Sequence, residues 1–120
     1  MAIETLRRAV DIGVRSEGET HPVVFASRLS LAEALLDAGR DTAEAAALLE
    51  QSPLEALRTL PPDHPILAQR LRVSGLLARS RQDATAARAF LRQSLDAYEK
   101  TFGSGHWRVK RARAELAALK

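Results

Sequence analysis

The sequence predicts an all-α protein built from stacked pairs of helices. Apolar residues recur at helical spacing along almost the whole chain. In addition, the three histidines, His21, His64 and His106, stand 43 and 42 residues apart in similar local sequences. A fixed period of this length is typical of repeat arrays, which usually bind their ligands on extended surfaces and not in a buried reaction centre.

The first two helices are expected from about Ile3 to Arg15 and from Pro22 to Ala38. Pro22 suits the first turn of a helix because its missing N–H would have no partner there. Gly39 follows the second helix and is a natural terminator, since glycine readily adopts the left-handed conformation that ends many helices.

A third helix is expected to start near Thr42, behind Asp41 as its cap, but Pro53 interrupts the pattern. The run Ser52-Pro53-Leu54-Glu55 has the form of a capping box with proline at the first helical position. It predicts two short helices, over about 42–51 and 53–60. A single helix kinked at Pro53 is the alternative, and the sequence alone does not decide between the two.

Three further helices are expected: from Pro65 to near Ser80, from the residue after Asp83 to Thr101, and from about Trp107 to Leu119. Gly103 ends the second of these. Small residues recur where the two helices of each pair should cross, which lets the backbones approach closely. They are Ala32 and Gly75 in the first helix of a pair, and Ala45 and Ala87 in the second.

Three blocks of the chain, Leu6–Ile12, Leu31–Leu35 and Leu95–Gly103, resemble the longer form of the tetratricopeptide repeat (TPR), as found in kinesin light chains and many bacterial proteins. The resemblance covers essentially the whole chain. It departs from the family pattern at Ser74-Gly75, at one residue inserted before Ala45, and at Pro53.

This resemblance implies a right-handed antiparallel helix-pair solenoid of about six helices. It divides a single domain, residues 1–120, into a half-repeat over 1–17, repeats over 21–61 and 64–103, and a half-repeat or capping helix over 106–120. Because the array opens and closes on half-repeats, we expect the chain to be part of a longer protein. In bacteria such repeats often accompany a regulatory or signalling domain.

The composition indicates the cellular compartment and the kind of genome from which the protein comes. The chain has no cysteine, which excludes disulfides and thiolate metal sites and fits a reducing, cytoplasmic location. No apolar run approaches the length of a membrane span, and the first 15 residues lack the apolar core of a signal peptide. Arginine outnumbers lysine 15 to 3, which indicates a GC-rich and therefore bacterial genome.

The net charge of +3 hides a division between the two halves. Residues 1–63 carry a net charge of −5, whereas residues 64–120 carry +8. Such asymmetry indicates charged partners, or copies that associate end to end, although a solvated surface without a partner also explains it.

Neither a catalytic nor a metal site is predicted. The chain has no Gly-x-Ser-x-Gly elbow and no glycine-rich phosphate loop, so we expect neither an enzyme nor a cofactor. Equivalent histidines in successive repeats would lie about 8–10 Å apart, too far to share a zinc ion that needs ligands at about 2 Å. Each histidine is instead expected to satisfy backbone groups at the start of a helix.

The predicted function is that of a non-catalytic interaction module whose concave groove binds a peptide or helix of a partner protein. Leucines would supply apolar contact, while Arg72, Arg79 and Arg111 would attract an acidic segment. The full set of predicted groove residues is Leu29, Glu33, Leu36, Asp37, Gln69, Arg72, Leu76, Arg79 and Arg111.

Two other functions compete with this one. The chain could be a self-associating or spacer segment of a larger bacterial signalling protein. It could also bind nucleic acid, because the last helix combines one aromatic residue with four cations. That alternative is weaker, since a single aromatic gives no stacking platform. The residues are Trp107, Arg108, Lys110, Arg111 and Arg113.

Overall fold

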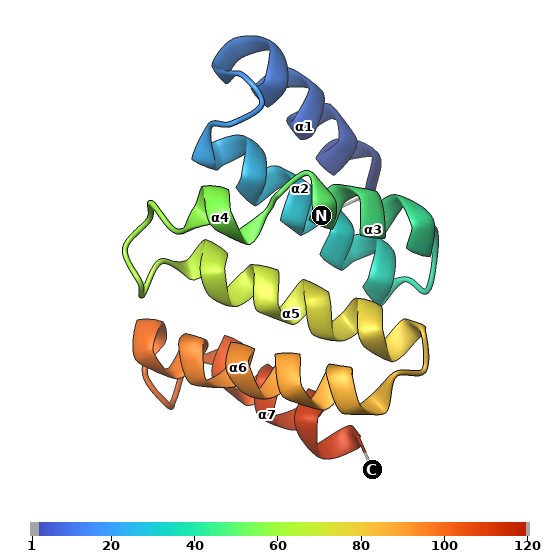
Figure 1. The fold of residues 1–120 in the computed structure, drawn as a ribbon, viewed down its shortest axis with the longest axis vertical. Helices are drawn as coiled ribbons and strands as arrows, with labels where there is room; N and C mark the ends of the chain where they lie inside the picture. The colour runs from blue at the N-terminus through green and yellow to red at the C-terminus, as the bar shows by residue number, and fades with distance from the viewer. Residues whose placement is uncertain (1–2, 120) are drawn as a thin grey trace.

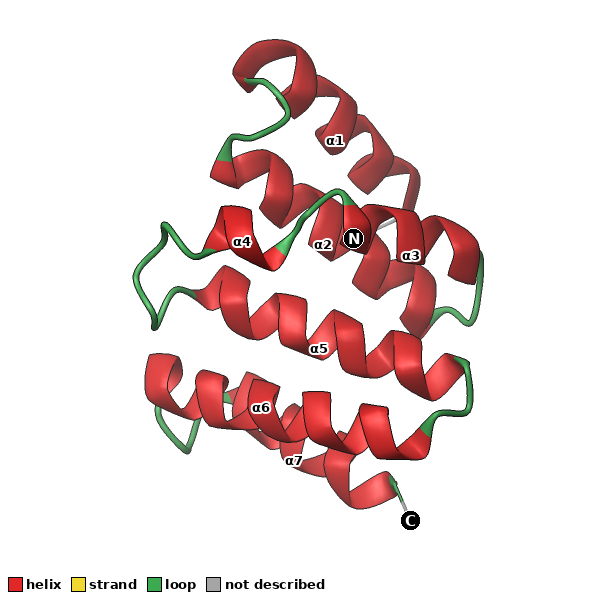
Figure 2. Cartoon of the chain, in the orientation of Figure 1, coloured by secondary structure: helices red, strands yellow, loops and turns green. Residues whose placement is uncertain are grey.

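A computed structural model describes residues 3–119, and within that range every regular element is a helix (Figure 2). The all-α prediction is therefore confirmed. The described part contains seven helices, one more than expected, because the third is divided. They are α1 (Ile3–Glu17), α2 (Pro22–Asp37), α3 (Thr42–Glu50), α4 (Leu54–Leu57), α5 (Pro65–Ser80), α6 (Ala84–Phe102) and α7 (Trp107–Ala118).

The helices are stacked along the longest of three axes that measure 41, 30 and 25 Å (Figure 1). Short loops turn the chain back on itself, so α2, α5 and α7 run in one direction while α3 and α6 run in the other. In Figure 1, α3 and α4 lie in front of α2, and α6 lies in front of α7. Helix α5 packs against α2, α3, α4 and α6, which makes it the centre of the stack.

Each histidine starts a helix as the sequence predicted. The Nδ1 atoms of His21, His64 and His106 accept hydrogen bonds from the backbone N–H groups two residues ahead, at 3.1, 3.2 and 3.1 Å. Each bond satisfies one of the N–H groups that a helix leaves without an internal partner at its start. The repeated histidine is thus a structural device that fixes where α2, α5 and α7 begin.

The predicted helix terminators Gly39 and Gly103 and the predicted cap Asp83 are confirmed, whereas the predicted cap Asp41 behaves differently. Gly39 and Gly103 adopt positive φ angles of 68° and 83° directly after their helices, and the Asp83 carboxylate accepts a hydrogen bond from the N–H of Ala86. Asp41 occupies the cap position of α3, but its side chain makes no capping hydrogen bond. Its carboxylate lies instead 3.8 Å from guanidinium nitrogens of both Arg7 and Arg40.

The predicted third helix is interrupted at Pro53 and is not a single kinked helix, since α3 ends at Glu50 and α4 starts at Leu54. The predicted capping box is wrong. Pro53 itself is the cap residue of α4, and the buried hydroxyl of Ser52 has no hydrogen-bond partner among the described residues. The second piece is also shorter than the expected 53–60.

Two arginines from other helices satisfy the backbone at this break. Arg28 of α2 donates to the carbonyl of Gln51 at 3.4 Å, and Nε of Arg70 of α5 donates to the carbonyl of Ser52 at 2.7 Å. A carbonyl left without a helical partner is costly when it is removed from water. These tertiary contacts therefore stabilise the broken conformation over a continuous helix.

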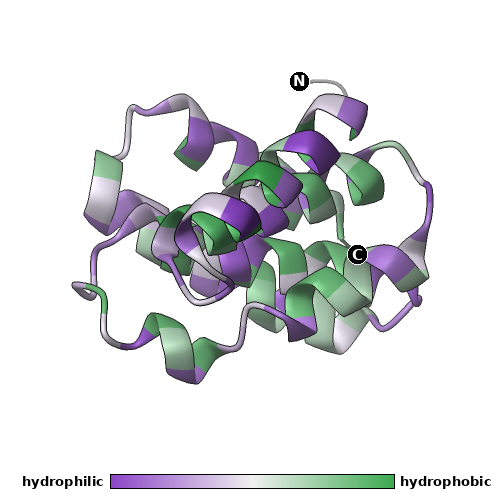
Figure 3. Cartoon of the chain, turned by 90° about the horizontal axis from the view of Figure 1, so that it is seen from above, coloured by the Kyte–Doolittle hydropathy of each residue, from purple (hydrophilic) through white to green (hydrophobic). Residues whose placement is uncertain are grey.

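The apolar side chains form two clusters, and amphipathic helices supply both. Figure 3 shows hydrophobic and hydrophilic residues sharing the same helices. The larger cluster joins α1 to α5, and its fully buried members include Leu29, Leu35 and Leu57. The smaller cluster joins α5, α6 and α7 around Tyr98 and Val109. No described helix is both long and apolar enough to cross a membrane.

All four small residues predicted at helix crossings are buried. The tightest crossing is that of α5 and α6 at Gly75. A Cβ added to Gly75 would lie 2.7 Å from both Cγ and Cδ2 of Leu91, and 3.2 Å from the Leu91 backbone nitrogen. Only glycine allows the two helices to approach this closely.

We expect Gly75→Ala to lower the free energy of unfolding. Overpacking a core typically costs about 1–3 kcal/mol, while replacing a helical glycine with alanine gains at most about 1 kcal/mol. The expected net loss is about 1–2 kcal/mol, measurable by urea denaturation. Gly105→Ala is the matched control, because no atom lies within 4 Å of the added Cβ. Equal stability of the two variants would show that the crossing can relax.

Candidate binding surface

The predicted groove residues come from α2, α5 and α7, and the structure sorts them into three groups. Glu33, Asp37, Gln69, Arg72 and Arg111 meet in one polar network. Leu29, Leu36 and Leu76 belong to the core. Arg79 stands apart from both groups: it is exposed at the end of α5 and makes no ion pair within the described part of the chain.

Arg72 is the centre of the network. Its side chain is only 3 % exposed, yet it contacts three carboxylates. It binds Glu115 of α7 through two hydrogen bonds, from Nε at 2.9 Å and from Nη2 at 2.6 Å. Its Nη1 donates to Glu33 of α2, and Nη2 lies 3.3 Å from Asp37. One guanidinium of α5 therefore links α2 to α7.

The environment of Arg72 keeps it charged. Burial by itself lowers the pKa of an arginine, since it removes water from the charged form. The hydrogen bonds that Arg72 donates to Glu115, together with the negative charge of Glu33, outweigh burial and raise the pKa of Arg72 above its ordinary value. Because its charge is already matched by the chain's own carboxylates, Arg72 is not free to attract an acidic partner.

The three leucines also have a different role from the predicted one. Leu29 and Leu76 are at most 1 % exposed, and Leu36 is 9 % exposed. All three pack inside the larger core cluster. They are core residues and not apolar anchors for a ligand, because their side chains offer almost no surface to a second molecule.

Two further groove residues surround Glu33. The amide of Gln69 donates to Glu33 at 2.7 Å and to the hydroxyl of Ser30 at 3.0 Å. A guanidinium nitrogen of Arg111 lies 3.7 Å from the same carboxylate. The Nε–H of Arg111 is buried and has no hydrogen-bond partner among the described residues, while 30 % of the side chain as a whole is exposed.

A pocket of about 260 Å³ lies beside this network, where α2, α5, α6 and α7 meet. Its wall contains hydrogen-bonding groups, two guanidinium groups and two aromatic rings. The lining residues are Ser30, Glu33, Pro65, Gln69, Tyr98, Trp107, Arg108 and Arg111. Three of these, Glu33, Gln69 and Arg111, were predicted groove residues, whereas Trp107, Arg108 and Tyr98 were not assigned to the groove.

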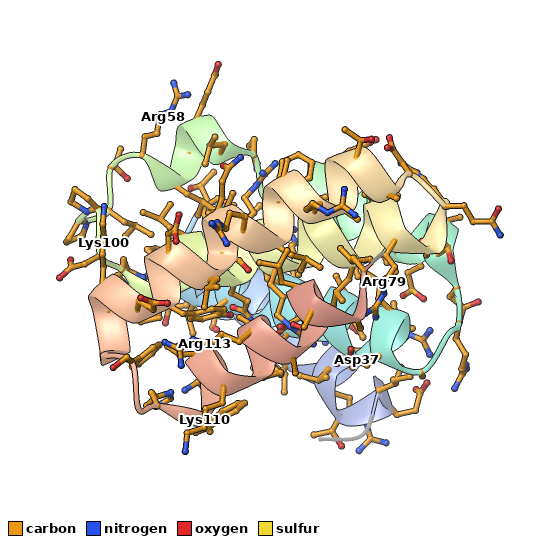
Figure 4. The ribbon with its side chains drawn as sticks, turned by 90° about the horizontal axis from the view of Figure 1, so that it is seen from below. Asp37, Arg58, Arg79, Lys100, Lys110 and Arg113 are labelled. Atoms are coloured by element: carbon orange, nitrogen blue, oxygen red, sulfur yellow. The ribbon has the colours of Figure 1, made fainter. Side chains whose placement is uncertain are left out.

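Trp107 stands at the edge of the pocket with 55 % of its surface exposed. The guanidinium carbon of Arg108 lies 4.4 Å from the centre of its ring system, and that of Arg111 lies 5.0 Å away. Arg108 also lies over Phe102 at 5.1 Å. These cation–π contacts hold both arginines in fixed positions. Lys110 and Arg113 project from the same helix (Figure 4).

The aromatic wall continues into the core. The rings of Tyr98 and Phe102 are stacked at 6.1 Å, and Phe102 is stacked on His106 at 4.3 Å. Tyr98 is 2 % exposed. Burial, helped by the negative charge of Glu33, raises the pKa of Tyr98 to about 12. The phenol is therefore neutral at physiological pH and can act as a hydrogen-bond donor.

The arrangement has the features of a binding surface and lacks those of a metal site. Within residues 3–119, no group of three or more His, Asp or Glu side chains is placed to hold a metal ion. The sequence matches no known protein-family model and is not significantly similar to any curated protein. Any assignment of function must therefore come from the residues of this surface.

Because of the Arg72 network, we expect substitutions of the two α5 arginines, Arg72 and Arg79, to differ strongly in their effect on stability. Arg72→Gln leaves the largely buried carboxylates of Glu33 and Glu115 without their partner, and breaking a buried pair typically costs about 3–5 kcal/mol. Arg79→Gln removes an exposed charge and is expected to change stability by less than about 0.5 kcal/mol. Urea denaturation of both variants measures the contrast. Similar small losses for the two variants would mean that the network contributes little.

From the raised pKa of the buried Tyr98 phenol, we expect the free energy of unfolding to fall at alkaline pH. Because its pKa is raised in the folded state, its contribution is complete below about pH 10 and is lost as pH rises through 12. A rise in the Tyr98 pKa from 10 to about 12 corresponds to about 2–3 kcal/mol in the free energy of unfolding. Denaturation curves between pH 9 and 12 should show this loss in the wild type. Tyr98→Phe cannot ionise, so a variant with the same alkaline loss would contradict the assignment.

Proposed function

We propose that this chain is a non-catalytic protein-interaction module of the tetratricopeptide type, which binds an extended segment of a partner protein at the Trp107 pocket. The observation that carries the proposal is the half-exposed Trp107 with two arginines stacked against it. Tryptophan and arginine are the residues most enriched in binding hot spots. Tryptophan is also enriched at protein–protein interfaces relative to the rest of the protein surface.

The charges of the pocket favour an acidic segment. Glu33 shares Arg72 with Asp37 and Glu115 and is also paired with Arg111, whose side chain is 30 % exposed, whereas Arg108 has no carboxylate partner among the described residues. A carboxylate of the partner could bind both arginines, while an apolar side chain next to it packs on Trp107. Gln69 and the Tyr98 hydroxyl could bind the partner's backbone.

The repeat character of the fold supports the same proposal. Three histidine-capped helices at nearly constant spacing, and small residues where paired helices cross, are features that a helix-pair solenoid requires. In such arrays the first helix of each pair contributes to one shared surface. The corresponding helices here are α2, α5 and α7, and all three line the pocket.

The test is a selection of 12-residue peptides from a random display library on the immobilised wild-type chain. The affinity of the synthesised winners is then measured by fluorescence anisotropy. We expect winners that combine Asp or Glu with an apolar residue. Trp107→Ala and Arg108→Glu should each weaken their binding at least about tenfold, as loss of a hot spot does, and added salt should weaken it further.

Arg79→Glu is the matched control, because Arg79 is exposed on α5 and does not line the pocket. Unchanged affinity in this variant, together with loss in the two pocket variants, is the expected pattern. Equal affinity in all variants would contradict the proposal. If no peptide is selected and a generic RNA binds at low salt through α7, the nucleic-acid alternative gains support.

A second candidate function is self-association, and the exposed face of α1 favours it. Ile12 on this end helix is 64 % exposed, and the two halves of the chain carry opposite net charge. Copies could therefore associate end to end, as a spacer or assembly segment would. Light scattering over a range of concentration and salt tests this function. A constant monomer mass would exclude it.

A further inference from the structure

A second groove lies on the opposite side of α5 from the Trp107 pocket. Gln69 and Arg72 of α5 face α2 and α7, whereas Arg70, Ser74 and Leu77 face the other way, because neighbouring helical positions differ by about 100°. The groove has a volume of about 530 Å³ and separates α3 from α6. Its lining residues are Leu49, Arg70, Ser74, Leu77, Ala78, Arg81, Asp83, Ala86 and Phe90.

The floor of this groove is apolar. Leu77 of α5 and Leu49 of α3 border it from one side, and Phe90 of α6 from the other. Phe90 is only partly buried and belongs to neither of the two core clusters. A large aromatic ring that contributes to no core cluster and borders a groove is available to pack against a second molecule.

The groove carries more positive than negative charge, since two arginines but only one carboxylate line it. Arg70 is partly buried, and burial lowers its pKa without any opposing effect from a nearby carboxylate. Its Nε bonds the Ser52 carbonyl at the break after α3, which anchors the side chain. Arg81 is exposed and, among the described residues, has no carboxylate partner. The carboxylate of Asp83 is already used in capping α6.

A buried or partly buried charge without a counter-charge is unfavourable, so a ligand that brings a carboxylate to Arg70 would relieve that cost. The fork of the guanidinium suits a carboxylate in particular. The groove therefore combines an apolar floor with an anchored, unpaired arginine. A helix or extended segment that carries acidic and apolar residues side by side complements both features.

We propose that this outer groove between α3 and α6 is a second protein-docking site, which binds an amphipathic acidic segment of a partner. Apolar side chains of the partner pack against the partly exposed Leu49 and Phe90, and a carboxylate binds Arg70 with Arg81 at the rim. The site uses none of the residues of the Trp107 pocket. With both sites occupied, one chain would hold two partner segments on opposite faces.

The test uses a chain whose Trp107 pocket has been disabled by Trp107→Ala together with Arg108→Glu. Peptides of 14 residues are selected from a random display library on this variant, and the affinity of the synthesised winners is measured by fluorescence anisotropy. We expect winners with Asp or Glu next to Leu, Ile or Phe. Their binding to the wild-type chain should equal their binding to the disabled variant.

Two substitutions then locate the binding. Arg81→Glu reverses an exposed rim charge and should weaken binding at least about tenfold. Arg88→Glu is its control, since Arg88 is also exposed but lies outside the groove, in a pocket that α6 shares with Leu116 of α7. Phe90→Ser should weaken binding similarly, whereas Phe90→Leu should largely retain it. Circular dichroism verifies that each variant is folded.

Selection of no peptide by the disabled variant would overturn this proposal while leaving the Trp107 pocket untouched. Winners that bind Arg81→Glu and Phe90→Ser as well as the parent would also overturn it, because they would occupy some other surface. Conversely, the Trp107 pocket could fail its own selection while the outer groove passes. The two outcomes are distinguishable because the two sets of variants share no residue.

Discussion

The ion-pair network of Arg72 is the interaction on which the arrangement of this molecule depends. It joins α2, α5 and α7 through carboxylates that lie far apart in the sequence, at positions 33, 37 and 115. Apolar packing links α2 to α5 and joins α5, α6 and α7 in the smaller core cluster, and polar contacts of Arg72 and Arg111 tie α7 further to α5 and α2. A buried charge of this kind tolerates few alternative geometries, so it fixes how the helices sit relative to one another.

This network also defines what the surface beside it can bind. Arg72 and Arg111 together offset most of the negative charge that Glu33, Asp37 and Glu115 would otherwise present beside the Trp107 pocket. The arginines that remain for a ligand, Arg108 and Arg111, are held against the ring of Trp107. An arrangement set before binding loses little side-chain entropy when the ligand arrives. Gln69 and Arg111 belong both to this network and to the groups that would contact a ligand.

The break at Pro53 connects the fold to the outer groove. The loss of helix after Glu50 leaves two backbone carbonyls that Arg28 and Arg70 satisfy from neighbouring helices. Because its Nε is used in this way, Arg70 is anchored at the groove with its other donors uncommitted. Pro53 thus has a local structural cost and, in our proposal, a consequence for binding.

Helix positions and boundaries were predictable from the sequence because they depend on local signals. The spacing of apolar residues, the histidines at the helix starts, and Gly39 and Gly103 at the ends each act within a few residues along the chain. Small residues at helix crossings were predictable for the same reason, since Gly75 interrupts a pattern of larger side chains.

Only the tertiary structure decided what the charged and apolar groove residues do. Helical register placed Leu29 and Leu76 near the expected surface, but neighbouring helices cover them completely. Register likewise identified Arg72 without revealing its three carboxylate partners, the most distant 43 residues away. Exposure and charge pairing depend on which distant segments meet, and for this chain those meetings were set by packing that no local pattern encodes.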